Sequence, residues 1–397
     1  MAANAATWVT LDAEELIATS QRATGLTDFG ATDPRESLCQ LVKSLNDEAC
    51  LTAQGMAGKR GALIRVLSNR LLLHNEFVKN PRIADERILK PIVILGLPRS
   101  GTTKLHRMIA ADPAMQKLSL WKLLYPVQAL TAGPGTDVEK RIAATEAFVD
   151  AIRVSNPPLY AGHPMLAREP DEEYFGMEIS FLAHINTSSF HTPGYEAWLD
   201  SQPFDNWYAW LKKLMQYEQY TDGLAGRPWV LKAPHHLAHL PLLLEYFPDA
   251  TVVHLHRDPS VIVPSFCALI AASRRATTYN YRPEEVGRYI LRIYHRRMQL
   301  YLRDRAALAH APAILDIPYE RVVRDAPTVI GECYAAAKLP LDAAAVRAMA
   351  AWEAANAQHK HGRHQYHIAD YGVTEQQIAQ AFGAYSARFR DYLQPSK

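Results

Sequence analysis

The chain has 397 residues and a formal net charge of +2, so its surface as a whole lacks the strong positive charge of a general nucleic-acid binder. Hydrophobic residues make up 48% of the sequence, which is enough to bury a large core, and the length predicts one large domain with an appendage, or two domains. No segment approaches the roughly 18 uninterrupted apolar residues of a membrane span. The N-terminus has no signal-peptide pattern and the four cysteines have no ligand or disulfide spacing, so we expect reduced thiols and a cytoplasmic location.

Residues 1–90 carry apolar side chains at three- and four-residue spacing, which predicts helices throughout this segment. No pattern of residues with recognisable chemistry occurs in it. We therefore expect a helical extension that caps an α/β domain formed by residues 91–397. A contact within a homo-oligomer and a lid are two further roles that this segment allows.

The α/β domain is predicted to begin with a strand, a glycine loop and a helix. Ile92 to Leu95 form a short apolar run of mostly β-branched residues, which is typical of a strand buried on both faces of a parallel sheet. The sequence GLPRSGTT follows, and then an apolar pattern with helical spacing. This arrangement directs free backbone N–H groups and the positive end of a helix at a phosphate group.

The loop fits the Walker A pattern G-x-x-x-x-G-K-[ST] in the spacing of Gly96 and Gly101, but not in its charge. Thr102 stands in the place of the lysine, and the cation lies earlier in the loop as Arg99. A triphosphate-binding enzyme would lack its main charge clamp. The loop can instead bind a diester or anhydride with a single transferable group, through Arg99, the loop amides and two hydroxyls. A glycine turn in an unrelated α/β protein is the alternative interpretation.

Residues 157–226 are rich in aromatic side chains. We expect most of these to pack helices against one another, and a minority to line an apolar pocket for a small molecule. The same segment contains an acidic run, residues 168–173. Acidic runs usually mark solvated helix starts, and the alternative is that Glu172 or Glu173 acts as a general base.

A second strand is predicted at Trp229 to Leu231, with Lys232 at its end. A lysine at the carboxyl end of a parallel strand faces the crevice where open α/β sheets bind ligands. A solvated lysine is the alternative. His235, His236 and His239 follow, but no cysteine or glutamate completes a ligand set, so we do not expect zinc here.

A third strand is predicted at Thr251 to Leu255, followed by Arg257 and a helix that begins near Pro259. Ser265 lies eight residues after Arg257, two turns into this helix. A protein-kinase reading of the His-Arg-Asp triplet fails because no metal-binding asparagine follows at the required distance. Neither this strand nor the first ends in the aspartate that a magnesium-dependent NTPase needs.

Together the two loops resemble those of sulfotransferases that use 3′-phosphoadenosine 5′-phosphosulfate. The first is similar to their 5′-phosphosulfate loop, P-[KR]-[ST]-G-T-[TS], and the second to the motif R-[DN]-P-x-x-x-x-x-S, which grips the 3′-phosphate. The resemblance covers nearly the whole chain and points to bacterial enzymes with an N-terminal helical extension. It implies an α/β fold with a P-loop-type sheet of parallel strands flanked by helices, in which residues 157–226 form an acceptor-side insertion.

The resemblance also implies which residues contact the donor. The R-K-G-x-x-G tail of the cytosolic animal enzymes is missing, and residues 360–363 are expected to replace it. The implied donor contacts are Arg99, Ser100, Gly101, Thr102, Thr103, Arg257, Ser265, Lys360, Gly362 and Arg363.

Sulfuryl transfer resembles phosphoryl transfer, in which positioning and electrostatic stabilisation dominate. We expect Lys232 and Arg99 to stabilise the leaving oxygen without a metal ion. The acceptor hydroxyl needs a general base, for which His235 is the first choice, Glu172 or Glu173 the rival and His236 a third possibility. We expect the acceptor to be small and apolar because of the aromatic residues.

Two other functions stay open from the sequence. One is a P-loop nucleotide kinase or other NTPase, which Thr102 and the missing magnesium aspartate disfavour. The other is a non-catalytic nucleotide-binding protein on the same scaffold, which Lys232 and Arg257 disfavour.

Overall fold

A parallel β-sheet forms the centre of the protein. The computed structural model describes residues 10–128, 136–308, 314–356 and 367–393, and within them four strands pair in the order β2-β1-β3-β4. All neighbouring pairs are parallel, so the carboxyl ends of the strands lie at one edge of the sheet. The predicted α/β fold with a P-loop-type sheet is thereby confirmed. The strands are β1 (Ile92–Gly96), β2 (Val230–Lys232), β3 (Thr251–His256) and β4 (Ile314–Pro318).

The strand β1 is buried on both faces, as its continuous apolar sequence predicts. Successive side chains of a strand point to opposite faces, and the contacts of β1 follow this rule. Val93 and Leu95 pack into one apolar cluster, while Ile92 and Ile94 pack into another. The sheet therefore separates two cores, each of which needs a layer of helices.

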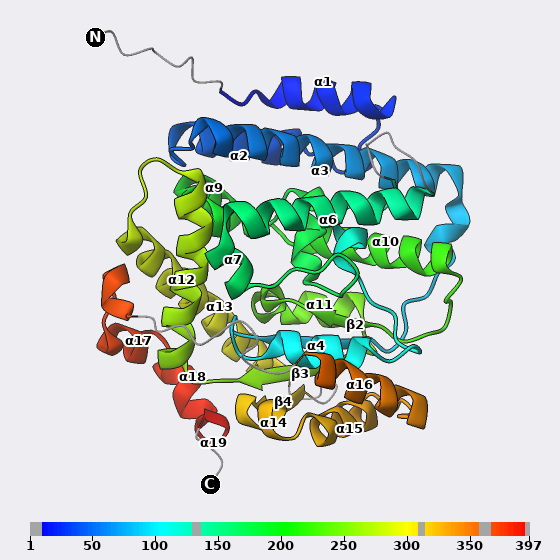
Figure 1. The fold of residues 1–397 in the computed structure, drawn as a ribbon, viewed down its shortest axis with the longest axis vertical. Coiled ribbons are helices and arrows are strands. Elements are labelled where there is room, and N and C mark those ends of the chain that lie inside the picture. The colour runs from blue at the N-terminus through cyan, green and yellow to red at the C-terminus, as the bar shows by residue number, and fades with distance from the viewer. Residues whose placement is uncertain (1–9, 129–135, 309–313, 357–366, 394–397) are drawn as a thin grey trace.

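Helices cover both faces of the sheet (Figure 1). One face packs on α4 (Thr102–Ala110), α15 (Ala326–Ala336) and α16 (Ala343–Ala355). The opposite face packs on a larger set, which includes α10 (Asp205–Asp222), α11 (Leu240–Tyr246), α12 (Pro259–Thr277) and α13 (Pro283–Ala307).

Further helices, most of them short, complete the fold. The remaining α-helices of the α/β domain are α5 (Leu120–Leu124), α6 (Asp137–Ser155), α7 (Pro157–Gly162), α8 (Ile185–Ser189), α9 (Pro193–Leu199), α14 (Tyr319–Arg324), α17 (Glu375–Ala381), α18 (Gly383–Arg388) and α19 (Arg390–Leu393). The 3₁₀ helices are η1 (Pro81–Asp85), η2 (Glu173–Phe175), η3 (Met177–Ser180), η4 (Pro234–Ala238) and η5 (Ile368–Tyr371).

The segment before β1 is helical, with α1 (Ala13–Thr24), α2 (Arg35–Asp47) and α3 (Ala53–Lys79). In Figure 1 these helices lie at the opposite end of the molecule from α14, α15 and α16. Their apolar side chains belong to the same cluster as those of α10 and the adjoining face of the sheet. Because one core joins the two parts, no separate core marks a boundary at residue 90, and a domain division there stays a prediction.

Buried polar side chains of α3 also fasten the extension to the α/β domain. Arg70 is fully buried and donates from Nε to the carbonyl of Phe29 at 3.1 Å and from Nη1 to the carbonyl of Ile179 at 2.7 Å. Lys59 Nζ donates to Asn186 Oδ1 at 2.5 Å and lies 3.4 Å from Glu178 Oε1. Each cation satisfies carbonyl or carboxylate oxygens that would otherwise be buried without a partner.

Most aromatic side chains of residues 157–226 lie in this shared core, among them Tyr195, Trp207, Tyr208 and Trp210. This burial agrees with the interpretation that they pack helices. Across the described ranges, no helix is both long enough and apolar enough to cross a membrane.

Replacing Arg70 with leucine should lower the free energy of unfolding by about 3 kcal/mol, because the carbonyls of Phe29 and Ile179 would lose their buried donors. Urea denaturation followed by circular dichroism measures this change. The matched control is Arg82→Leu, at an exposed position of η1, which should change stability by about 0.5 kcal/mol or less. Equal effects of the two substitutions would contradict the anchoring role of Arg70.

Candidate active site

The loop between β1 and α4 has a backbone that favours glycine at two positions. Gly101 has a φ of 84°, and a Cβ atom there would lie 2.7 Å from the ring of Tyr319. A Cβ atom at Gly96 would lie 2.7 Å from the carbonyl oxygen of Leu255 on β3. Arg99 also adopts left-handed backbone geometry, with a φ of 71°. The two glycines thus let the loop turn tightly against the ends of its neighbours.

The loop presents hydrogen-bond donors without matching acceptors. It ends at α4, whose first N–H groups have no partner within the helix and carry the positive end of the helix dipole. Ser100 is fully buried, and its Oγ has no hydrogen-bond partner among the described residues. An anionic group is the ligand that such a set of donors holds best.

The structure brings the second sequence motif to this loop. Arg257, just after β3, donates from Nη1 to the carbonyl oxygen of Arg99 at 2.7 Å across 158 residues of sequence. Arg99 in turn donates from Nε to Ser265 Oγ on α12 at 3.2 Å. The guanidinium of Arg257 also stacks on Tyr319, 4.0 Å from the ring centroid. Two arginines and a serine from separate elements therefore meet beside one loop.

Lys232 reaches the same loop from β2. It pairs in register with Ile94 on β1, so its side chain leaves the sheet near the start of the loop. Lys232 Nζ lies 2.6 Å from Glu172 Oε1 and 3.5 Å from Thr103 Oγ1 at the start of α4. The side chain of Lys232 is 1% exposed and that of Glu172 is 19% exposed. Glu172 is thus the member of this pair that a molecule entering from solvent can reach.

Glu173, next in the chain, points into the protein and supports Lys232 from behind. Its Oε2 accepts the backbone N–H of Lys232 at 3.0 Å, and its Oε1 lies 2.7 Å from His236 Nε2. His236 Nδ1 lies 2.8 Å from the hydroxyl of Tyr208. Burial opposes ionisation of Glu173, but its contact with His236 outweighs burial, so its pKa lies below the ordinary value. Both carboxylate oxygens of Glu173 are thus held inside the protein, beside Lys232 and His236.

His235, the first choice of general base from the sequence, is not part of this arrangement. Its ring is completely buried, 4.3 Å from the ring centre of Trp207, with His239 and Phe204 also in contact. Neither ring nitrogen has a hydrogen-bond partner in the described part of the chain. Burial lowers the pKa of His235 well below its ordinary value. The 3₁₀ geometry of η4 turns His236, not His235, toward the acidic residues.

The acidic run is not a solvated helix start, which corrects the other sequence-based interpretation. Asp171 is buried, and its Oδ1 lies 3.1 Å from His163 Nε2 and accepts the N–H of Glu172 at 2.8 Å. Arg107 of α4 lies 3.8 Å from its other carboxylate oxygen. Burial raises the pKa of Asp171, but the attraction of His163 and neighbouring cations is stronger, and the pKa is held well below the ordinary range.

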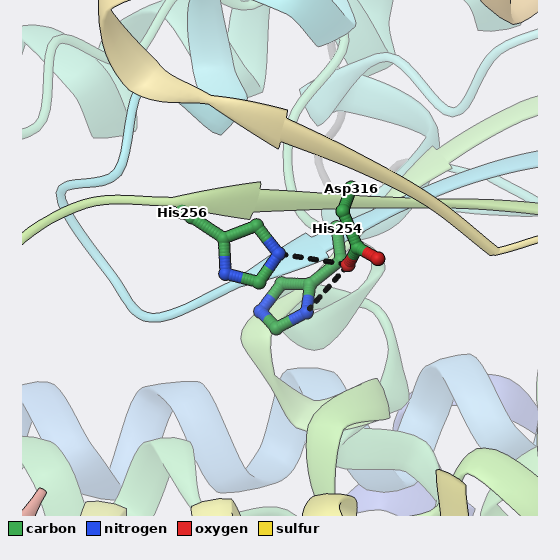
Figure 2. Close-up of side chains that lie close together, drawn as sticks. All are labelled: His254, His256 and Asp316. Carbon is green, nitrogen blue, oxygen red and sulfur yellow. Dashed lines mark hydrogen bonds and ion pairs between the residues drawn. The ribbon is translucent and has the colours of Figure 1, made fainter. Parts of the chain in front are cut away.

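One further group of side chains has the composition of a metal site. Figure 2 shows His254 and His256 of β3 directed at one carboxylate oxygen of Asp316 on β4, at 3.9 Å and 2.8 Å. Arg305 donates to both oxygens of the same carboxylate, and Tyr385 lies 3.1 Å from His256 Nδ1. Because a guanidinium already neutralises the only carboxylate of this group, we interpret it as a hydrogen-bond network that braces β3 against β4.

Comparison with known proteins identifies the kind of chain that carries this geometry. A sequence model described as the sulfotransferase family matches residues 91–343. The chain belongs to the sulfotransferase family. The matched residues begin just before β1 and include the loop, Lys232 and the second motif, so the resemblance inferred from the two motifs is confirmed.

Curated relatives are sulfotransferases of mycobacteria. The omega-hydroxy-beta-dihydromenaquinone-9 sulfotransferase Stf3 of Mycobacterium bovis and that of Mycobacterium tuberculosis are each 27% identical to this chain over 208 residues. The alignment covers 51% of this chain and 51% of each relative. The chain therefore spans about half the length of the curated relatives it matches.

Solved sulfotransferase structures match over nearly the full chain. STF1 from Mycobacterium tuberculosis has a TM-score of 0.80 at 29% identity, with 94% of this chain and 99% of that chain covered. STF9 from Mycobacterium avium has a TM-score of 0.85 at 24% identity, with 99% and 100% covered. The shared fold therefore includes the helices that precede the sheet.

The sulfotransferase contacts implied by the motifs divide into two groups. Those of the two loops and Lys232 converge at the carboxyl edge of the sheet. Lys360, Gly362 and Arg363 lie outside the described residues and stay predictions. Sequence reasoning did not identify Asp171, His163 and Tyr319 as supports of the site, and the acidic run 168–173 was the signal that includes Asp171.

Gly101→Ala should lower the free energy of unfolding by about 2 kcal/mol, because the new methyl group meets Tyr319 and alanine resists a positive φ. Gly331→Ala is the matched control: a Cβ there has no atom within 4 Å, and helix α15 should gain about 0.5 kcal/mol. Urea denaturation of both variants measures the difference. Equal stability of the two would show that the loop tolerates a side chain at Gly101.

The depressed pKa of Asp171 predicts an acid-sensitive contribution to stability. This contribution is complete above the ordinary pKa of 3.8, where the unfolded carboxyl is ionised, and is lost as the pH falls toward the lower folded pKa. The wild type should therefore lose stability between about pH 5 and 3, and Asp171→Asn should lose less over the same range. Denaturation curves across this range test the slope, and identical slopes would contradict it.

Proposed function

We propose that the protein transfers the sulfuryl group of 3′-phosphoadenosine 5′-phosphosulfate to a hydroxyl group of a small acceptor. One observation carries this proposal: Lys232 Nζ lies between Glu172 and Thr103 at the start of α4, where the loop donors converge. In-line transfer of a charged group requires a cation, an anion-binding loop and an accessible carboxylate close to one another.

The loop fits the sulfate-bearing end of the donor. The buried Ser100 hydroxyl without a partner in the described chain and the N–H groups at the start of α4 suit its oxygens. Arg257 and Ser265 lie beside the same loop, which agrees with their proposed contact with the 3′-phosphate. Lys360, Gly362 and Arg363 are proposed to complete this contact.

In the proposed reaction, the acceptor oxygen forms a bond to sulfur while the bond from sulfur to the bridging phosphate oxygen breaks. Lys232 stabilises the negative charge that grows on the bridging oxygen. Glu172 accepts the proton of the acceptor hydroxyl, and it replaces His235 in this role because its carboxylate is partly exposed beside Lys232. Glu173, His236 and Tyr208 hold the backbone of Lys232 in position.

A hydroxylated acceptor agrees with the name of the mycobacterial relatives, which specifies an omega-hydroxy compound. The apolar character that we infer for the acceptor of this chain rests on the aromatic residues not used in the core. A homo-oligomer and a cytoplasmic location also stay predictions. All four cysteines are free thiols, which agrees with the expectation of reduced cysteines. A P-loop nucleotide kinase is not favoured, because the loop lacks the lysine of that class and the family is that of sulfotransferases.

The test is to incubate the protein with labelled phosphosulfate donor and a panel of phenols, sterols and long-chain alcohols, and to identify products by mass spectrometry. A sulfated product and release of adenosine 3′,5′-bisphosphate are expected. Tight binding of that nucleotide with no transfer to any acceptor would favour a non-catalytic binding protein. Magnesium-dependent turnover of ATP would overturn the proposal.

With an active acceptor in hand, Lys232→Ala and Glu172→Gln should each lower kcat by about 10² or more, because one removes charge stabilisation and the other removes the base. Donor affinity of Glu172→Gln, measured by calorimetry, should stay close to that of the wild type. His235→Phe keeps the ring packed against Trp207 and should retain most of the activity. A larger loss for His235→Phe than for Glu172→Gln would restore the histidine as base.

A further inference from the structure

A second group of unsatisfied donors lies away from the candidate active site, at the junction of α9, α12 and α13. Here the surface has a hollow of about 220 Å³, lined by residues that include His191, Thr192, Arg274, Arg288 and Arg292. A second hollow of about 210 Å³ adjoins it, because both share His191, Arg274 and Glu285. None of these residues belongs to the two sequence motifs.

Arg274 is the buried cation of this hollow. It is 4% exposed, and it donates from Nε to the carbonyl of Ser188 at 3.0 Å and from Nη2 to the carbonyl of Thr187 at 2.7 Å. Its third nitrogen, Nη1, has no hydrogen-bond partner within the described ranges. The guanidinium also stacks on Tyr289, 4.8 Å from the ring centroid, which fixes its orientation. A buried N–H group of a cation without an acceptor is costly unless a ligand supplies one.

Thr192 provides an independent second donor in the same hollow. It is 2% exposed, and its Oγ1 likewise has no partner among the residues that the structure describes. Arg288 lines the mouth of the hollow from α13, is exposed, and forms no ion pair with another described residue. Two residues with buried, unpartnered donor atoms among the described residues, and one exposed cation, thus line one hollow.

The carboxylates around the hollow already have cationic partners. Glu196 accepts both Nε and Nη2 of Arg292, at 3.1 Å and 2.9 Å to Oε1 and 2.7 Å to Oε2. Glu285 lies 3.6 Å from His191 Nδ1 and 3.9 Å from Arg282. Neither carboxylate accepts a hydrogen bond from Arg274, so its Nη1 stays an open donor among the described residues, although Glu196 and Glu285 both attract its charge.

We propose that this hollow binds a small oxyanion, a carboxylate, sulfate or phosphate group, between Arg274, Thr192 and Arg288. The site is distinct from the donor loop: Arg274 follows Ser265 by nine residues on α12, which places it about 13 Å further along the helix axis. It is connected to the active site, because the Oγ of Ser188 lies 3.4 Å from the hydroxyl of Tyr174, which directly follows Glu173. An anion held by Arg274 would therefore fix the segment that carries the acidic residues.

Sulfate binding can be measured by calorimetry with the donor loop filled by adenosine 3′,5′-bisphosphate, at ionic strength held constant with chloride. Thr192→Val and Arg288→Gln should each weaken sulfate binding about tenfold, because each removes a donor to a charged group. Thr192→Val should leave the unfolding midpoint without sulfate unchanged, since its hydroxyl has no partner to lose among the described residues. Arg347→Gln, at an exposed position of α16, is the control and should bind sulfate as the wild type does.

Titrations with phosphate and acetate show which oxyanion geometry the hollow prefers. The proposal is overturned if the wild type binds none of these anions better than chloride, or if Thr192→Val and Arg288→Gln bind sulfate as tightly as the wild type. If adenosine 3′,5′-bisphosphate itself does not bind, the proposed function fails. The sulfate titrations of the variants without nucleotide still decide on the second site, because neither substitution touches the donor loop.

Discussion

The parallel register of β1 with its two neighbours is the constraint on which the candidate site depends. Ile94 pairs with Lys232 on one side and with Val253 on the other, so the chain leaves all three strands at the same edge. Backbone pairing thereby brings together a loop, a lysine and an arginine from distant parts of the sequence. The hydrogen bond from Arg257 to the Arg99 carbonyl joins the first and last of these directly.

The sequence predicted this part of the molecule well, because strands buried on both faces have a continuous apolar pattern and the loops between strand and helix have fixed spacing. The surroundings of the acidic run and of the histidines of η4 could not be predicted in the same way. Asp171, Glu172 and Glu173 face three different partners, and His235 and His236 face opposite surroundings. In irregular or 3₁₀ backbone, buried residues do not recur at a fixed spacing, so burial cannot be predicted from the sequence pattern.

The residues around Lys232 show that the burial of a side chain matters as much as its residue type at this site. Glu173 stays ionised although it is buried, because His236 and the N–H of Lys232 both contact it. Glu172, one residue earlier, keeps access to solvent while it holds the lysine amine. The two adjacent carboxylates therefore differ in role because they differ in burial. Glu173 supports the structure, and Glu172 stays accessible to a substrate.

The buried cations of α3 bear on the order in which the protein folds during synthesis. Lys59 and Arg70 leave the ribosome about 110 to 130 residues before their partners Ile179 and Asn186, as the sequence separations of 109 and 127 residues show. Until then, the nascent helix α3 carries these positive side chains on the surface that becomes buried in the folded protein. Residues 1–90 therefore cannot complete the burial of these two side chains until the middle of the chain has been made.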